Sequence, residues 1–406
     1  MQQKIVSWLR RNLQYRDYLP NLDWFILVPY LLLSGIGIVM VFSSSSDYVI
    51  MRNVSPVSYL MKQAFFVILG LFIVAAFYII KLDVLKSMQK ILICIVVLII
   101  ALLYLLFAGH SVNGASAWIN VGFFNIQPVE FAKFILIWYL AYFFSHREHE
   151  IAQADLKNLG RNLVRPGIIV GLIMFLAILQ PDIGGTSILA AITLVLVFTS
   201  GARFLYGFSF SAIGFALVGA GFMYLQKLPI HASSGYQYRR LMAFVHPFAL
   251  AGTDGKQLVN SYYAINNGGW FGVGLGNSIQ KRGYLPAPYT DFIISITAEE
   301  LGLIAVIIIL ALVYFLAARI ILVGMRARDS FSALFCIGVG AMIMVQTTIN
   351  IGGISGILPI TGVTFPFVSY GGSSMLVLVM SIGVALNVSA TEKGIQKRRK
   401  QKMNKG

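Results

Sequence analysis

Long runs of hydrophobic residues recur from one end of the chain to the other, separated by short polar segments. Most of them approach the about 20 residues that an α-helix needs to cross a bilayer. The runs are continuous and do not alternate with polar positions, which favours helices over the strands of a membrane barrel. The pattern predicts ten spanning helices, at 24–44, 59–80, 89–108, 128–145, 167–180, 185–200, 206–226, 291–323, 331–352 and 373–389.

The composition supports this all-α, polytopic membrane fold. Of the 406 residues, 58% are hydrophobic and only 11% are charged, whereas a soluble protein carries roughly a quarter charged residues. The two cysteines, Cys94 and Cys336, lie inside apolar runs. They predict small core residues, without a disulfide framework or a metal site.

The positions of Lys and Arg predict the orientation of the helices. Connections on one side of the predicted bundle hold only Arg52, while those on the other side and the two tails hold many basic residues. The bias predicts that both termini are cytoplasmic. It also explains the net charge of +16 without nucleic acid.

This topology divides the chain into a cytoplasmic tail at 1–23, a membrane domain at 24–390 and a basic cytoplasmic tail at 391–406, the last expected to lie against anionic lipid. The connection 227–290, between the seventh and eighth helices, becomes a large extracytoplasmic loop. A polar stretch at 145–166 predicts a short interfacial helix.

The stretch Tyr284–Gly302 carries the densest candidate chemistry. Two prolines precede Thr290 and Asp291, which are predicted to cap the eighth helix. Glu299 and Glu300 follow about 12 Å deeper at 1.5 Å per residue. Counted around a helix, Glu299 lies about 80° and Glu300 about 180° from Asp291, so Glu299 is expected to face the same cavity. Acids at membrane depth favour a functional role, and the alternative is a structural polar cluster.

Other candidates stand near the outer ends of helices. Pro128 suits the first turn of the fourth helix, where Glu130 and Lys133 have the i, i+3 spacing of a pair on one helix face. That pair is either functional or a structural ion pair. Asp182 is a further outer-end acid, and Trp118 lies in a predicted interfacial loop, where it is a candidate site residue or a belt aromatic.

The long outer loop and the last loop add cations and hydroxyls. Arg239 and Arg240 suit bidentate recognition of phosphate, or they are solvated loop cations. Ser369 and Tyr370 belong to an uncharged loop rich in Pro, Gly and hydroxyl groups, which at membrane depth must be buried in protein or line a cavity. Gly272-Val-Gly-Leu-Gly276 lacks the strand that precedes a nucleotide-binding turn, so its glycines indicate close packing.

Five ordered segments resemble the SEDS family, which includes FtsW, RodA and SpoVE. The start of the first helix and Gly276–Lys281 favour the FtsW branch. The chain departs from the family where Ala287 and Tyr289 replace a common Glu and His, where Ala117 replaces Arg, and where Thr361 replaces a Lys of some members. The segments are Gln127-Pro-x-Glu-x-x-Lys133, Gln180-Pro-Asp-x-Gly184, Gly274-x-Gly-Asn-Ser-x-Gln-Lys281, Leu285–Phe292 with Glu299-Glu-Leu-Gly302, and Pro366-x-x-Ser-Tyr-Gly-Gly-Ser-Ser374.

The resemblance implies a peptidoglycan glycosyltransferase that polymerises lipid II at the outer face of the cytoplasmic membrane, together with a class B penicillin-binding transpeptidase. A sugar 4-hydroxyl attacks an anomeric carbon, and undecaprenyl diphosphate leaves. Asp291 matches the family's catalytic aspartate and is expected to act as general base. Arg239, Arg240 and Lys281 are expected to stabilise the diphosphate, with Mg²⁺ or Mn²⁺ left open and no organic cofactor.

Three alternatives remain open from the sequence. A lipid II flippase would also use buried polar groups such as Glu130, Lys133 and Asp182. The outer loop is long enough to be functional, and no internal repeat of the transporter type is seen, so the polymerase is favoured. A RodA-like elongation enzyme is the alternative to septal synthesis with other division proteins, and a non-enzymatic scaffold is the third reading.

Overall fold

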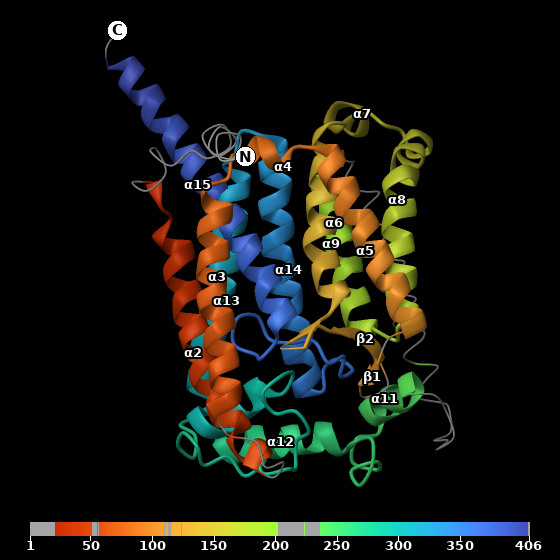
Figure 1. The fold of residues 1–406 in the computed structure, drawn as a ribbon, viewed down its shortest axis with the longest axis vertical. Coiled ribbons are helices and arrows are strands. Elements are labelled where there is room, and N and C mark those ends of the chain that lie inside the picture. The colour runs from red at the N-terminus through yellow and green to blue at the C-terminus, as the bar shows by residue number, and fades with distance from the viewer. Residues whose placement is uncertain are drawn as a thin grey trace.

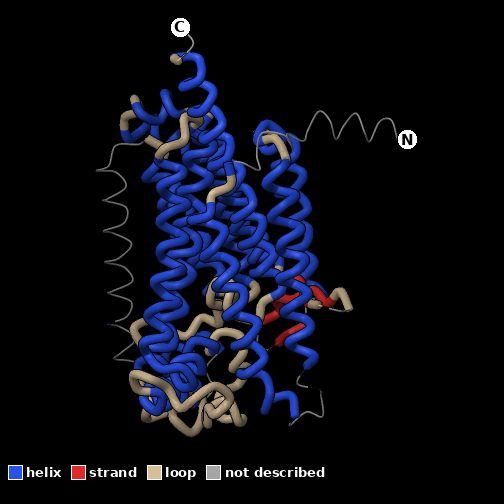
Figure 2. The backbone as a smooth tube through the Cα atoms, turned by 90° about the vertical axis from the view of Figure 1, so that its left-hand side faces the viewer, coloured by secondary structure: helices blue, strands red, loops and turns tan. Residues whose placement is uncertain are grey.

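The computed structural model describes residues 21–50, 55, 57–108, 110–112, 115–122, 124–201, 223 and 236–404. Within these ranges the protein is a bundle of long helices that run side by side (Figure 1). The short helices α11 and α12 and most of the loops gather at one end, which we call the cap end (Figure 2). At the opposite end α2 begins and α15 ends.

The long helices are α2 (Trp24–Ile50), α3 (Val57–Ile79), α5 (Met88–Ala108), α6 (Pro128–Ser145), α8 (Leu156–Leu179), α9 (Ile183–Thr199), α13 (Ile293–Met325), α14 (Ser330–Ser355) and α15 (Gly372–Met403). The short helices are α4 (Leu82–Leu85), α7 (Glu148–Ala152), α11 (Tyr236–Val245) and α12 (Lys256–Gly268).

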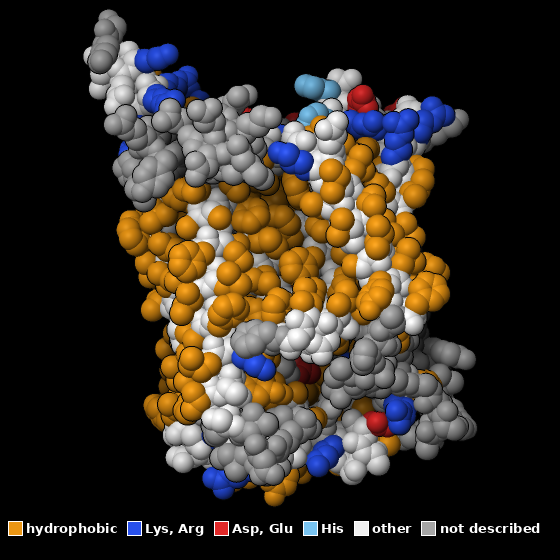
Figure 3. Space-filling view, viewed as in Figure 1, with side chains coloured by type: hydrophobic (Ala, Val, Ile, Leu, Met, Phe, Trp, Pro, Cys, Tyr) orange, Lys and Arg blue, Asp and Glu red, His pale blue; other side chains and the backbone are white. Residues whose placement is uncertain are grey.

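The predicted all-α membrane fold is confirmed. Eight of the described helices are long and apolar enough to cross a bilayer, and α9 is a shorter apolar helix. The predicted span at 206–226 lies outside the described residues. On the face drawn in Figure 3, hydrophobic side chains form a broad band across the bundle, and Lys and Arg gather at the end opposite the cap. The band is the surface expected to face lipid.

Several helix boundaries differ from the prediction, α2 for example ending at Ile50 rather than at 44. The polar stretch at 145–166 forms α7 and the first turns of α8, which therefore begins at Leu156 rather than at 167. α15 continues through the basic tail to Met403, because Lys, Arg and Gln are good helix formers and Pro is absent from that segment. α13 begins at Ile293 with Phe292 at its N-cap. The predicted capping by Thr290 and Asp291 is therefore wrong.

A small antiparallel sheet at the cap end was not predicted. Its strands β1 (His110–Val112), β2 (Ala115–Asn120) and β3 (Asn125–Ile126) are ordered β1-β2-β3. Trp118 lies on β2 opposite His110. Strands of two to six residues inside one connection leave no alternation long enough to be read from a sequence.

The helix α13 is broken at Gly302, whose φ is 81°. The loop after α12 fills the break: Val273 N donates to the Glu299 carbonyl at 2.9 Å, and Leu303 N donates to the Gly269 carbonyl at 2.9 Å. A Cβ at Gly302 would collide with the backbone of Trp270. The close packing that the glycines predicted is therefore a docking of the loop into the broken helix, which fixes the chain leading to Asp291.

Candidate active site

Asp291 lies in the turn that joins the cap to α13. Its carboxylate is half-buried, and Oδ1 accepts a hydrogen bond from Thr290 Oγ1 at 2.8 Å. Burial raises the pKa of Asp291 above its ordinary value, while the Thr290 bond and the charge of Arg240 lower it. The aspartate is thus a poorly solvated carboxylate with a cation near it, which are the properties of a tuned base.

The backbone of the Asp291 turn is held by the last loop and by α14. The Tyr289 carbonyl accepts from Tyr370 N at 2.9 Å, the Thr290 carbonyl from Ser369 Oγ at 2.6 Å, and the Asp291 carbonyl from Asn350 Nδ2 at 2.8 Å. Three consecutive carbonyls therefore have donors from a part of the chain about 60 to 80 residues later. The sequence named Ser369 and Tyr370 as candidate substrate-binding residues, without these contacts, and it missed Asn350.

A cluster of three tyrosines borders the turn. The Tyr59 and Tyr289 hydroxyls are 3.2 Å apart, and the ring of Tyr370 lies 5.1 Å from that of Tyr59 and 5.8 Å from that of Tyr289. Burial raises the pKa of Tyr370 to about 12. Tyr289 therefore ties the Asp291 turn to the N-terminal end of α3.

The charge of Arg240 acts on Asp291, and Arg240 also lines an apolar groove. Its guanidinium donates to the Ile360 carbonyl at 3.3 Å and is half-buried, whereas Arg239 is exposed. The groove has a volume of about 270 Å³ and lies among α9, α11, α14 and the last loop. Its lining comprises Pro181, Ile183, Ser187, Arg240, Leu241, Ile349, Leu358, Pro359, Ile360 and Thr361. The structure thus separates the two arginines that the sequence could not distinguish.

Glu130 and Lys133 form the predicted pair, with Nζ 2.7 Å from Oε1. Lys133 is fully buried and also donates to Gln346 Oε1 at 3.2 Å. Gln346 in turn donates to the Thr364 carbonyl at 3.0 Å. The pair is therefore connected to the last loop through Gln346 on α14. Gln346 lies one helical turn before Asn350.

Asp182 is the N-cap of α9. It accepts from Gly185 N at 2.7 Å and from Gln127 Nε2 at 2.9 Å, so it links the starts of α6 and α9. Burial raises the pKa of Asp182, and the negative charge of Glu130 raises it further, against the bonds from Gly185 and Gln127. Trp118 lies on β2 and is half-buried.

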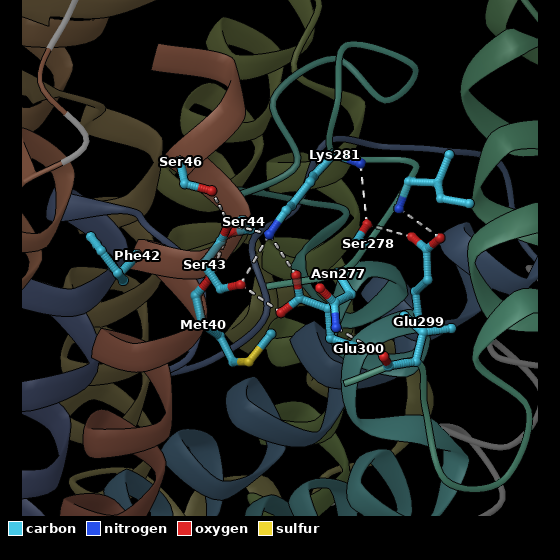
Figure 4. A network of polar contacts seen from close by, with 12 residues as sticks. Met40, Phe42, Ser43, Ser44, Ser46, Asn277, Ser278, Lys281, Glu299 and Glu300 are labelled. Carbon is cyan, nitrogen blue, oxygen red and sulfur yellow. Dashed lines mark hydrogen bonds and ion pairs between the residues drawn. The ribbon is translucent and has the colours of Figure 1, made fainter. Parts of the chain in front are cut away.

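The expectation that Glu299 shares a cavity with Asp291 is wrong. Both Glu299 oxygens accept hydrogen bonds: from Asn267 Nδ2 on α12 at 2.9 Å and, in the loop after α12, from Ile279 N at 3.0 Å. The Ser278 hydroxyl of the same loop is a third donor (Figure 4). The helical count failed because it began at Asp291, whereas the helix begins at Ile293. Glu299 is an anchor for that loop.

Lys281 is also occupied. Its ammonium group pairs with Glu300 and donates to the Ser43 carbonyl at 3.1 Å, all inside the protein (Figure 4). This buried network argues against the expected role of Lys281 as a ligand of the leaving diphosphate. Arg240 is the cation whose charge acts on Asp291. Ser43 was missed because nothing in an apolar helix marks one serine of four as the partner of a distant ion pair.

Among the described residues, no three side chains of His, Cys, Asp or Glu come together as a set of metal ligands. The residues around Asp291 therefore do not form a protein-only site for Mg²⁺ or Mn²⁺. A requirement for Mg²⁺ or Mn²⁺ stays a prediction.

A family model described as a cell cycle protein, covering FtsW, RodA and SpoVE, matches residues 23–394. The chain belongs to this SEDS family. An FtsW of Lactococcus lactis is 42% identical over 391 residues, covering 92% of this chain and 93% of the relative. An FtsW of Bacillus subtilis is 35% identical over 395 residues, covering 95% of each chain. Both carry the name "Probable peptidoglycan glycosyltransferase FtsW". The predicted SEDS membership and the FtsW-like character are confirmed.

Solved structures agree with the SEDS fold. One described as "Structural coordination of polymerization and crosslinking by a peptidoglycan synthase complex" has a TM-score of 0.73 and 25% identity, covering 91% of this chain and 98% of the other. The rod shape determining protein RodA of Thermus thermophilus has a TM-score of 0.63 and 24% identity, covering 92% and 97%. The second likeness supports the fold alone. The protein is a multi-pass membrane protein of this family.

Proposed function

We propose that this protein is a peptidoglycan glycosyltransferase that polymerises lipid II into glycan strands at the outer face of the bacterial cytoplasmic membrane. The observation that carries the proposal is Asp291, a poorly solvated carboxylate near Arg240 in a turn that two other segments hold. It stands at the position of the family's catalytic aspartate. The names of the FtsW relatives support the same activity.

In the proposed reaction, the Asp291 carboxylate takes the proton from the 4-hydroxyl of the acceptor sugar. The hydroxyl oxygen forms a bond to the anomeric carbon of the donor, and the bond from that carbon to the diphosphate oxygen breaks. The configuration at the carbon is inverted, and undecaprenyl diphosphate leaves with the bonding electrons. The acid form of Asp291 then returns its proton to solvent.

Arg240 is the proposed ligand for the departing diphosphate. A guanidinium offers a planar, bidentate set of donors and keeps its charge, so it stabilises the charge that develops as the bond breaks. The apolar groove on which Arg240 stands suits the isoprenoid chain that follows the diphosphate, because its other lining side chains are mainly Ile, Leu and Pro. Arg239, which is exposed, is proposed to act at longer range.

The cellular setting is part of the proposal. Both termini are cytoplasmic and the cap is extracytoplasmic, on the Lys and Arg bias of the connections. The partner is a class B penicillin-binding transpeptidase, supported by the complex with which this fold compares. The FtsW relatives favour septal synthesis, with RodA-like elongation as the alternative. Location at mid-cell or along the side wall distinguishes the two.

The test is polymerisation of purified lipid II in detergent by the protein with its transpeptidase. Asp291→Asn should leave the protein folded and abolish product. Asp254→Asn is the matched control, because Asp254 is an exposed acid between α11 and α12 at the same end of the molecule. Product from Asp291→Asn at the wild-type rate would remove the aspartate as base. A wild-type protein that makes no glycan would favour the flippase or scaffold, because detergent removes the need for transport.

A further inference from the structure

We propose that Asn350 and Ser369 are positioning residues that set where the Asp291 carboxylate meets the acceptor hydroxyl. The inference rests on the proposed function, because it concerns the same aspartate. Asn350 is on α14 and Ser369 is in the last loop, so neither is joined to Asp291 by local sequence. Both act through the backbone of the turn and have no role as proton carriers.

Asn350 and Ser369 each make hydrogen bonds both to the Asp291 turn and to the last loop. Ser369 Oγ donates to the Thr290 carbonyl at 2.6 Å and accepts from Phe365 N at 2.8 Å. Asn350 Nδ2 donates to the Asp291 carbonyl at 2.8 Å and to the Val363 carbonyl at 2.7 Å. Each side chain thus ties the turn to the last loop, and together they bind two successive carbonyls.

The Thr290 and Asp291 carbonyls have few other donors within the described residues. α13 begins at Ile293, so residues 290 and 291 lie before the helix and outside its regular hydrogen-bond ladder. Thr290 and Asp291 are half-buried. Carbonyls withdrawn from water need donors, and here the donors are side chains from elsewhere in the fold. A displacement of about 1 Å at a reacting group lowers a rate by about 10²-fold, so this bracing bears directly on turnover.

The two hydrogen bonds of Asn350 Nδ2 fix the orientation of its amide. Both of its hydrogens face carbonyl oxygens, so the flipped amide would set oxygen against oxygen, and the observed orientation is the favourable one. Its Oδ1 is buried and has no hydrogen-bond partner within the described residues. Asn350→Asp therefore keeps the shape but turns both donor contacts into repulsion, while Asn350→Ala only removes them.

The chain offers a matched control in Asn387. This asparagine on α15 is also buried and also donates through Nδ2 to two carbonyls, those of Phe77 and Ile80, far from the Asp291 turn. Each of Asn350→Ala and Asn387→Ala removes two bonds from Nδ2 to a carbonyl, and Asn387→Ala also removes the long 3.4 Å bond that its Oδ1 accepts from Thr391 Oγ1. Any effect found only for Asn350 therefore reflects its place beside Asp291.

The experiment measures kcat and the KM for lipid II on the folded, monodisperse fraction of each variant with its transpeptidase. Asn350→Ala and Ser369→Ala should lower kcat by about 10- to 100-fold, with KM changed less than about threefold. Ser369→Thr, which keeps the hydroxyl, should recover most of the rate. Asn387→Ala should keep the wild-type kcat even where its melting temperature falls.

Hydrogen exchange supplies a readout that does not depend on activity. Amides in the segment around 289–292 should exchange faster in Asn350→Ala and in Ser369→Ala, and not in Asn387→Ala. Wild-type kcat together with unchanged exchange in both variants would overturn the positioning role. If the wild-type protein makes no glycan, the proposed function fails, and the exchange data still decide whether the two side chains brace the turn.

Discussion

Lys281 and Glu300 form an ion pair that is closed to solvent, with Nζ 2.8 Å from Oε1 and side-chain exposures of 1% and 0%. Ser43 Oγ adds a hydrogen bond to Glu300 Oε2 at 2.6 Å. The pair joins the loop after α12 to the first turns of α13 and to α2. Its place indicates that these two charged residues hold the cap against α2 and α13 rather than contact phosphate.

Removing one partner should therefore destabilise the protein more than removing both. Lys281→Met or Glu300→Met alone leaves a buried charge without its partner, which costs about 3–5 kcal/mol. The double variant Lys281→Met/Glu300→Met should recover much of the loss. Thermal unfolding of the four proteins in one detergent checks this, and additive losses would contradict a coupled pair.

Arg240→Gln should change the pH dependence of the proposed reaction. Burial raises the pKa of Asp291, and the charge of Arg240 lowers it, so removing that charge raises the pKa further. Since the base must be ionised, the acid side of the rate profile should move to higher pH, and kcat should also fall. The exposed neighbour gives the control, Arg239→Gln, whose profile should stay closer to wild type. A profile unmoved by Arg240→Gln would separate the arginine from the aspartate.

Asp23 should make stability depend on acid pH. Burial raises its pKa, but hydrogen bonds from Arg319 and Ser389 and the charge of Lys393 together hold the pKa below the ordinary value. A lowered folded pKa gives stability that is present above the unfolded value of about 3.9 and is lost as the pH falls through the folded value. Asp23→Asn should melt below wild type near neutral pH, and the difference should shrink in acid. A constant difference down to about pH 3 would be evidence against the linkage.

Gly302→Ala should weaken the docking of the loop into α13 more than Gly276→Ala does. Both glycines have positive φ, at 81° and 87°, so both substitutions carry backbone strain of about 1–3 kcal/mol. Only the Cβ at position 302 meets another backbone, that of Trp270, whereas position 276 has open space. Melting temperatures compare the two, and equal losses would mean that strain alone acts at Gly302.

Much of the fold followed from short-range pattern. Hydrophobic runs predicted the described membrane helices because lipid leaves a spanning segment few alternatives to a helix. The i, i+3 spacing of Glu130 and Lys133 predicted their ion pair, and Pro128 stands at the start of α6 as its fixed φ favours. The two amides Gln346 and Asn350, spaced i, i+4 in an apolar helix, were a signal that the sequence offered and that was not used.

By itself, the sequence determined which segments enter the membrane and which local pairs share a helix face, because those depend on hydrophobicity and helical period. Only the tertiary structure decided that Lys281 is buried against Ser43, that Glu299 binds a loop, and that Asn350 and Ser369 hold the turn of Asp291. These contacts join residues from about 20 to 240 positions apart, and their partners are chosen by how the helices pack, which no local period records.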